Sequence, residues 1–67
     1  MTETLTAADL RPGDQVQFND KLGRPTWPTV LRVINDGTLV ELLIGDSRSA
    51  AYRAMAAGRE IVVRRAA

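Results

Sequence analysis

The chain has 67 residues, a formal net charge of +1, and neither cysteine nor histidine. A chain of this length forms one domain and buries only about 60% of its unfolded surface, so its stability is marginal without assistance. The missing residue types exclude disulfides and leave no thiolate or imidazole metal site, which makes oligomerisation or partner binding the expected source of assistance. The composition therefore predicts a small interaction domain without a cofactor.

Residues 1–10 predict a flexible N-terminal arm, and residues 11–67 a single domain. The arm has neither the basic start nor the apolar centre of a secretory signal, and no stretch of the chain is long enough to span a bilayer. Together with the absence of cysteine, these features predict a cytoplasmic protein without a membrane partner.

The domain begins with a Pro-Gly turn and a strand. Residues 14–18 alternate polar and apolar side chains, which predicts that Val16 and Phe18 face the core. Residues 19–28 contain glycine and proline and predict an irregular loop of the kind that often carries binding residues.

Trp27 lies in this loop beside Pro28, in a segment that proline keeps extended and stiff. Two roles fit it. The indole caps the open end of the core, or it is an aromatic anchor for a partner, with Lys21 and Arg24 at its rim.

A β-hairpin is the clearest prediction for the centre of the chain. Residues 29–34 and 38–44 are rich in β-branched and large apolar side chains, and Asp36-Gly37 favours a two-residue turn between them. This turn sets the only two charges of the strands, Arg32 and Glu41, opposite each other. The register predicted in this way pairs Asn35 with Thr38, Ile34 with Leu39, Val33 with Val40, Arg32 with Glu41, Leu31 with Leu42, and Val30 with Leu43.

Both faces of the predicted hairpin are apolar. One face, expected in the core, carries Leu31, Val33, Val40 and Leu42. The other holds Val30, Ile34, Leu39 and Leu43 around the charge pair. This second face is more apolar than a solvated face usually is, so we expect it to be covered. The cover comes from residues 50–57 of the same chain, or from another subunit or partner protein.

The alanine-rich segment at residues 48–57 predicts a short helix, with its N-cap at Asp46 or Ser47 and its end at Gly58. A short strand over residues 50–54 is the alternative.

Residues 60–64 predict the last strand. The motif RPGDQVQF at residues 11–18, the glycine-bearing loop after it and the motif VINDGTLVEL at residues 33–42 resemble the SH3-like small barrels, a group that includes Tudor and KOW modules. The resemblance covers most of residues 11–64. It implies a mainly β fold, a small SH3-like antiparallel barrel of four to five strands with one short helix before the last strand.

The chemistry-bearing residues argue against an enzyme. Without histidine and cysteine, a nucleophile and its base would have to come from hydroxyl groups, carboxylates or the single Lys21. The acidic residues Asp14, Asp36 and Asp46 stand where turns and caps use them, and the isolated glycines form no phosphate-binding run. We therefore expect neither catalysis nor a small-molecule substrate.

Two functions remain. The first is a non-enzymatic protein-binding module that self-associates or docks on a partner protein. Its expected site consists of Val30, Ile34, Leu39, Leu43 and Trp27. A host regulator, a phage-encoded accessory or inhibitory protein, and a structural subunit all fit such a module.

The alternative is a small nucleic-acid-binding barrel that uses the C-terminal third. Residues 47–67 carry five arginines and one glutamate, a local excess of positive charge. The residues expected at this surface are Arg48, Arg53, Arg59, Arg64 and Arg65. The same arginines also fit a simpler role as solvated side chains that keep a small apolar domain soluble.

Overall fold

The computed structural model describes residues 2–45 and 48–65. Its elements in chain order are β1 (Thr2–Thr6), the short 3-10 helix η1 (Ala7–Asp9), β2 (Gln15–Val16), β3 (Phe18–Asn19), β4 (Pro25–Thr26), β5 (Thr29–Asn35), β6 (Leu39–Gly45), β7 (Ala50–Ala56) and β8 (Glu60–Arg64). The mainly β class predicted from the sequence is confirmed, and the last strand has the predicted bounds.

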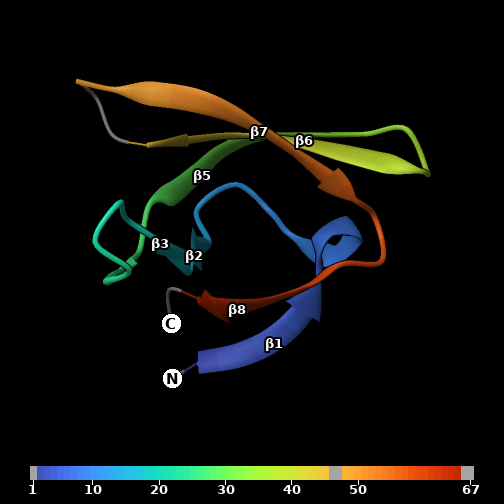
Figure 1. The fold of residues 1–67 in the computed structure, drawn as a ribbon. Coiled ribbons are helices and arrows are strands. Elements are labelled where there is room, and N and C mark those ends of the chain that lie inside the picture. The colour runs from blue at the N-terminus through green and yellow to red at the C-terminus, as the bar shows by residue number, and fades with distance from the viewer. Residues whose placement is uncertain (1, 46–47, 66–67) are drawn as a thin grey trace.

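The strands pair antiparallel in one large sheet and one small one. The large sheet has the order β1-β8-β2-β5-β6-β7, and β3 pairs with β4 separately. Figure 1 shows the large sheet bent into two layers, with β5, β6 and β7 across the top and β8 and β1 below. In the described part of the chain the edge strands β1 and β7 do not pair with each other, so the expected closure into a barrel does not occur.

The N-terminal segment belongs to the fold. β1 pairs with β8 over its whole length, from Thr2 opposite Arg64 to Thr6 opposite Glu60. Ala7 follows β1 directly in the chain and is buried in the core. Its backbone N–H donates a hydrogen bond to the carbonyl of Arg59 at 2.8 Å. Where the sequence predicts a loose arm, the structure has a sheet edge, because β8 offers a free row of backbone groups on the side away from β2.

The core lies between the two layers and takes side chains from both. Its buried apolar residues are Ala7, Leu10, Val16, Val30, Val40, Leu42, Ile44, Met55, Ile61 and Val63. Phe18 packs against this cluster and is partly exposed. The predicted inward orientation of Val16 and Phe18 is therefore confirmed.

The predicted hairpin exists, but its predicted register is wrong. Asn35 pairs with Val40 instead of Thr38, which makes the connection longer than the expected Asp36-Gly37 turn. The Asp36 carboxylate accepts hydrogen bonds from the backbone N–H groups of Leu39 and Thr38, at 2.7 and 2.9 Å. These bonds lower the pKa of Asp36 below its ordinary value. They also stabilise a loop that is longer than a two-residue turn.

A bulge at Leu31 changes the faces of β5. The register shifts between Val30 and Arg32, so Val30 pairs with Ile44 and Arg32 with Leu43. Val30, expected on the same face as Ile34, lies instead in the core with 1% of its surface exposed. Leu31, expected in the core, is exposed. A bulge has this effect because one extra residue reverses the alternation of side chains beyond it.

The helix expected before the last strand does not form. Residues 50–56 form β7, whose seven residues all pair with β6, from Leu39 opposite Ala56 to Gly45 opposite Ala50. The expected N-caps Asp46 and Ser47 lie outside the described residues. Helix propensity is a weak preference, and the pairing with β6 that buries Met55 overrides it.

Candidate functional site

We call the side of β5, β6 and β7 that faces away from the core the outer face, and it carries apolar side chains in three successive rows. Leu43 pairs with Arg32 on one side and with Tyr52 on the other, so these three side chains form a row across the sheet. Ile34 and Leu39 continue the apolar surface toward the hairpin loop. The exposed fractions of Ile34, Leu39 and Tyr52 are 47%, 49% and 59%, which is high for three large apolar side chains on one face of a sheet.

This outer face also contains two opposite charges without partners. Glu41 pairs in the sheet with Ile34 and Ala54, and Arg32 stands one row away beside Leu43. Neither side chain forms an ion pair or a hydrogen bond within the described residues. The predicted opposition of Arg32 and Glu41 across the hairpin is wrong, yet both charges lie on the predicted face.

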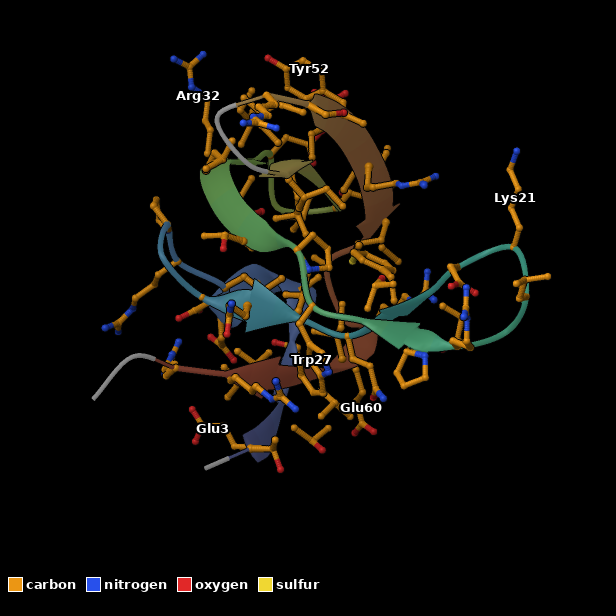
Figure 2. All side chains as sticks on the ribbon, turned by 90° about the vertical axis from the view of Figure 1, so that its left-hand side faces the viewer. Glu3, Lys21, Trp27, Arg32, Tyr52 and Glu60 are labelled. Carbon is orange, nitrogen blue, oxygen red and sulfur yellow. The ribbon has the colours of Figure 1, made fainter. Side chains whose placement is uncertain are left out.

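No described segment covers the outer face. The alanine-rich segment, which was one of the two expected covers, extends the sheet as β7. Figure 2 shows Arg32 and Tyr52 projecting from the same end of the molecule, away from the rest of the fold. We define the outer face by Arg32, Ile34, Leu39, Glu41, Leu43 and Tyr52. Of the expected protein-binding residues, the structure brings Ile34, Leu39 and Leu43 together there and places Val30 inside.

Trp27 lies away from the outer face. The guanidinium carbon of Arg64 stands 3.8 Å from the centre of its ring, which is the geometry of a cation-π contact. Arg24 is paired with Asp20 at 3.1 Å, and Lys21 extends from a loop tip far from the indole (Figure 2). The half-buried Trp27 therefore meets Arg64, and the expected rim of Lys21 and Arg24 does not form.

The loop that carries Lys21 is held by Asp20. The Asp20 carboxylate accepts hydrogen bonds from the backbone N–H groups of Arg24 and Leu22, at 2.9 and 2.8 Å. The bond from Arg24 is the main reason why the pKa of Asp20 is lower than its ordinary value. A side-chain clamp of this kind orders the turn and needs no ligand.

The five C-terminal arginines do not form one surface. Arg64 contacts Trp27, and Arg48 is exposed just before β7. Arg65 is half-buried and has structural partners: its Nε donates to Asp14 at 3.1 Å, its Nη1 lies 3.4 Å from Glu3, and its Nη2 donates to the carbonyl of Asp9 at 3.0 Å. The hydrogen bond with Asp14 raises the pKa of Arg65 above its ordinary value.

Asp14 is buried, and it joins the opening turn to the last strand. Its carboxylate accepts hydrogen bonds from the backbone N–H of Arg11, at 3.0 Å, and from the guanidinium of Arg65.

We expect Asp14→Asn to lower the free energy of unfolding by about 2 kcal/mol, because it removes the charge that compensates a half-buried cation. Urea denaturation checks the value. In a double-mutant cycle with Arg65→Gln, the double variant should lose less stability than the sum of the two single losses. A loss equal to that sum would contradict the pairing of Asp14 with Arg65.

Arg53 and Arg59 meet at a different place. Together with Phe18, Asn19, Ala54 and Met55 they line a hollow of about 330 Å³. Arg53 lies on the edge strand β7, on the same side of the sheet as Met55, and Arg59 follows Gly58 in the turn before β8. Within the described residues neither guanidinium forms an ion pair or a hydrogen bond. Both arginines belong to the expected nucleic-acid surface, and the sequence does not indicate that they line one hollow.

Two features are absent from the described residues: a cluster of metal ligands and a membrane-spanning helix. These residues contain no group of three or more acidic side chains close enough to hold a metal ion. Within residues 2–45 and 48–65 no helix has the length and apolar character needed to cross a membrane. Comparisons with protein-family models, with curated proteins and with solved structures found no match.

Proposed function

We propose that this chain is a non-enzymatic interaction module that self-associates through the outer face, with a second copy of the chain as the partner. The observation that carries the proposal is an uncovered face of large apolar side chains that contains one unpaired arginine and one unpaired glutamate. In an isolated domain this apolar surface would be exposed to water, and the exposure would lower the solubility of the protein.

The charges favour a second copy over an unrelated partner. In a dimer with two-fold symmetry each copy presents the same patch, so a residue i that contacts j is matched by j contacting i. A patch that carries Arg32 and Glu41 in adjacent rows of the sheet is complementary to itself when each charge meets its opposite on the other copy. The apolar residues around the charges then exclude water and strengthen the pairs.

A standard interface takes about 800 Å² from each partner, which is about a sixth of the 4760 Å² of accessible surface of this chain. Three strands of seven residues each present the outer face. Burial of the face would also supply the assistance that a 67-residue domain without disulfides needs.

We also infer that the fold is an open relative of the SH3-like small barrels. The support is the strand order: β5, β6 and β7 form a meander, and β8 returns to pair with β2, the first strand of residues 11–64. Barrels of this kind need the same return of the last strand to the first.

The proposal predicts a change of mass in solution. We expect the wild-type chain to be a dimer by light scattering and Leu39→Glu to be a folded monomer, because the added carboxylate would be buried without a partner. Leu22→Glu is the matched control. Leu22 is 75% exposed on the loop held by Asp20, so this variant should remain dimeric. A wild-type monomer at millimolar concentration would overturn self-association.

Charge reversal tests the two-fold pairing itself. Arg32→Glu and Glu41→Arg should each weaken the dimer by about tenfold or more, because each places like charges opposite one another. The double variant Arg32→Glu/Glu41→Arg should restore the wild-type mass. If the double variant is as weak as the single ones, the two copies do not meet in this way.

A further inference from the structure

The hollow beside β7 is a concentrated positive site. Arg53 and Arg59 both line it, and its described lining contains no carboxylate. Arg24 and Arg65 form ion pairs with acidic residues, and Arg64 stacks on Trp27. Two unpaired cations at one hollow repel each other, and a bound anion would remove that cost.

The rest of the lining identifies the type of anion. Guanidinium groups match the oxygens of a phosphate, to which they donate in pairs. Phe18 adds an aromatic ring that is partly exposed, and Asn19 adds an exposed amide that both donates and accepts hydrogen bonds. A volume of about 330 Å³ lies at the small end of the range for organic ligands.

We propose that this hollow binds a nucleotide, with the phosphate held by Arg53 and Arg59 and the base against Phe18. The nucleotide is either free or one unit of a single-stranded nucleic acid, since both present one phosphate next to one unpaired base. Aromatic rings beside positive charge are the usual means of binding single strands, because every base has a face that stacks. The site is separate from the outer face, so it does not depend on the dimer.

The test uses the full chain and a fluorescently labelled eight-residue oligothymidylate in a polarisation assay. Arg53→Gln/Arg59→Gln should weaken binding by about tenfold or more, because it removes two charge-assisted contacts. It should also make the dependence of log affinity on log salt concentration shallower by about 0.7, the value for the one phosphate of a single strand that the two arginines hold. Arg11→Gln/Lys21→Gln is the matched control, since it removes two exposed positive charges that do not line the hollow.

A variant that lacks the aromatic ring of Phe18 and a set of unlabelled competitors complete the design. Phe18→Leu, with folding checked by circular dichroism, should weaken the oligonucleotide about fivefold or more. Competition by thymidine monophosphate would identify a free nucleotide as the ligand, and competition only by unlabelled oligonucleotide would identify a single strand. The proposal is overturned if no probe binds or if the two double variants weaken binding equally. It is also overturned if inorganic phosphate or duplex DNA competes as well as the preferred nucleotide.

Discussion

Leu42→Ala is expected to lower the free energy of unfolding by about 3 kcal/mol, which is typical of a leucine removed from a packed core. Leu42 is 0% exposed and belongs to the core cluster. Its neighbours on β5 and β7 in the sheet are Val33 and Arg53. A domain of this length has a total stability of about 3–10 kcal/mol, so the variant should be largely unfolded in mild denaturant.

The adjacent leucine provides the control. Leu43 has the same side chain on the opposite side of β6, on the outer face. In the monomeric Leu39→Glu background, where association does not contribute, Leu43→Ala should cost less than about 1 kcal/mol. Urea denaturation followed by Trp27 fluorescence measures both variants. Equal losses would show that the two faces of β6 are not assigned as described.

The comparison of these leucines shows what the hairpin sequence determines. Alternation along β6 is regular, and it correctly predicts that Val40 and Leu42 face the core while Leu39 and Leu43 do not. Alternation along β5 is interrupted at Leu31, and nothing in its run of apolar residues indicates where an extra residue is accommodated. The register differs from the predicted one for a related reason. The side-chain oxygens of Asn35 and Asp36 accept hydrogen bonds from the backbone N–H groups of Gly37 and Leu39, and these bonds open the turn.

The alanine-rich segment shows the limit of local propensity. Alanine favours a helix in isolation, yet residues 50–56 pair with β6. The preference of each alanine is small, whereas a paired strand satisfies the backbone groups along one side of β6 and buries Met55. Composition alone could not reveal this, because the deciding partner is a strand formed elsewhere in the chain.

The sequence predicts the parts of the candidate sites that come from neighbouring residues in the chain, and it does not predict the parts that join distant residues. Five residues of the outer face follow from the hairpin pattern alone: Arg32, Ile34, Leu39, Glu41 and Leu43. Tyr52 joins them only because β7 is a strand. The pairing of Arg65 with Asp14 links positions 51 residues apart, and the meeting of Arg53 and Arg59 at one hollow depends on the same strand. Such contacts leave no local signal in a single sequence.

Gly45→Ala is expected to be as damaging as the loss of Leu42, at about 3 kcal/mol or more. Gly45 ends β6 with φ at +142°, a conformation that residues with a side chain rarely adopt. A Cβ at this position would collide with the carbonyl oxygen of Ser49 and lie 2.8 Å from the Cα of Ala50. Both obstacles are backbone atoms, so relief would require β7 to move away from β6.

Two other glycines separate the cost of the positive φ at Gly45 from the cost of the collision with neighbouring backbone atoms. Gly37 has φ at +94° and open space around it, so Gly37→Ala should cost about 1 kcal/mol from the backbone conformation alone. Gly58 has neither a positive φ nor a neighbour within 4 Å, so Gly58→Ala should be close to neutral. Thermal denaturation of the three variants should therefore rank Gly45 far above Gly37, and Gly37 above Gly58. A Gly45→Ala variant as stable as Gly58→Ala would mean that the backbone of Ser49 does not lie against Gly45. The placement of β7, and with it the position of Arg53 at the hollow, would then be wrong.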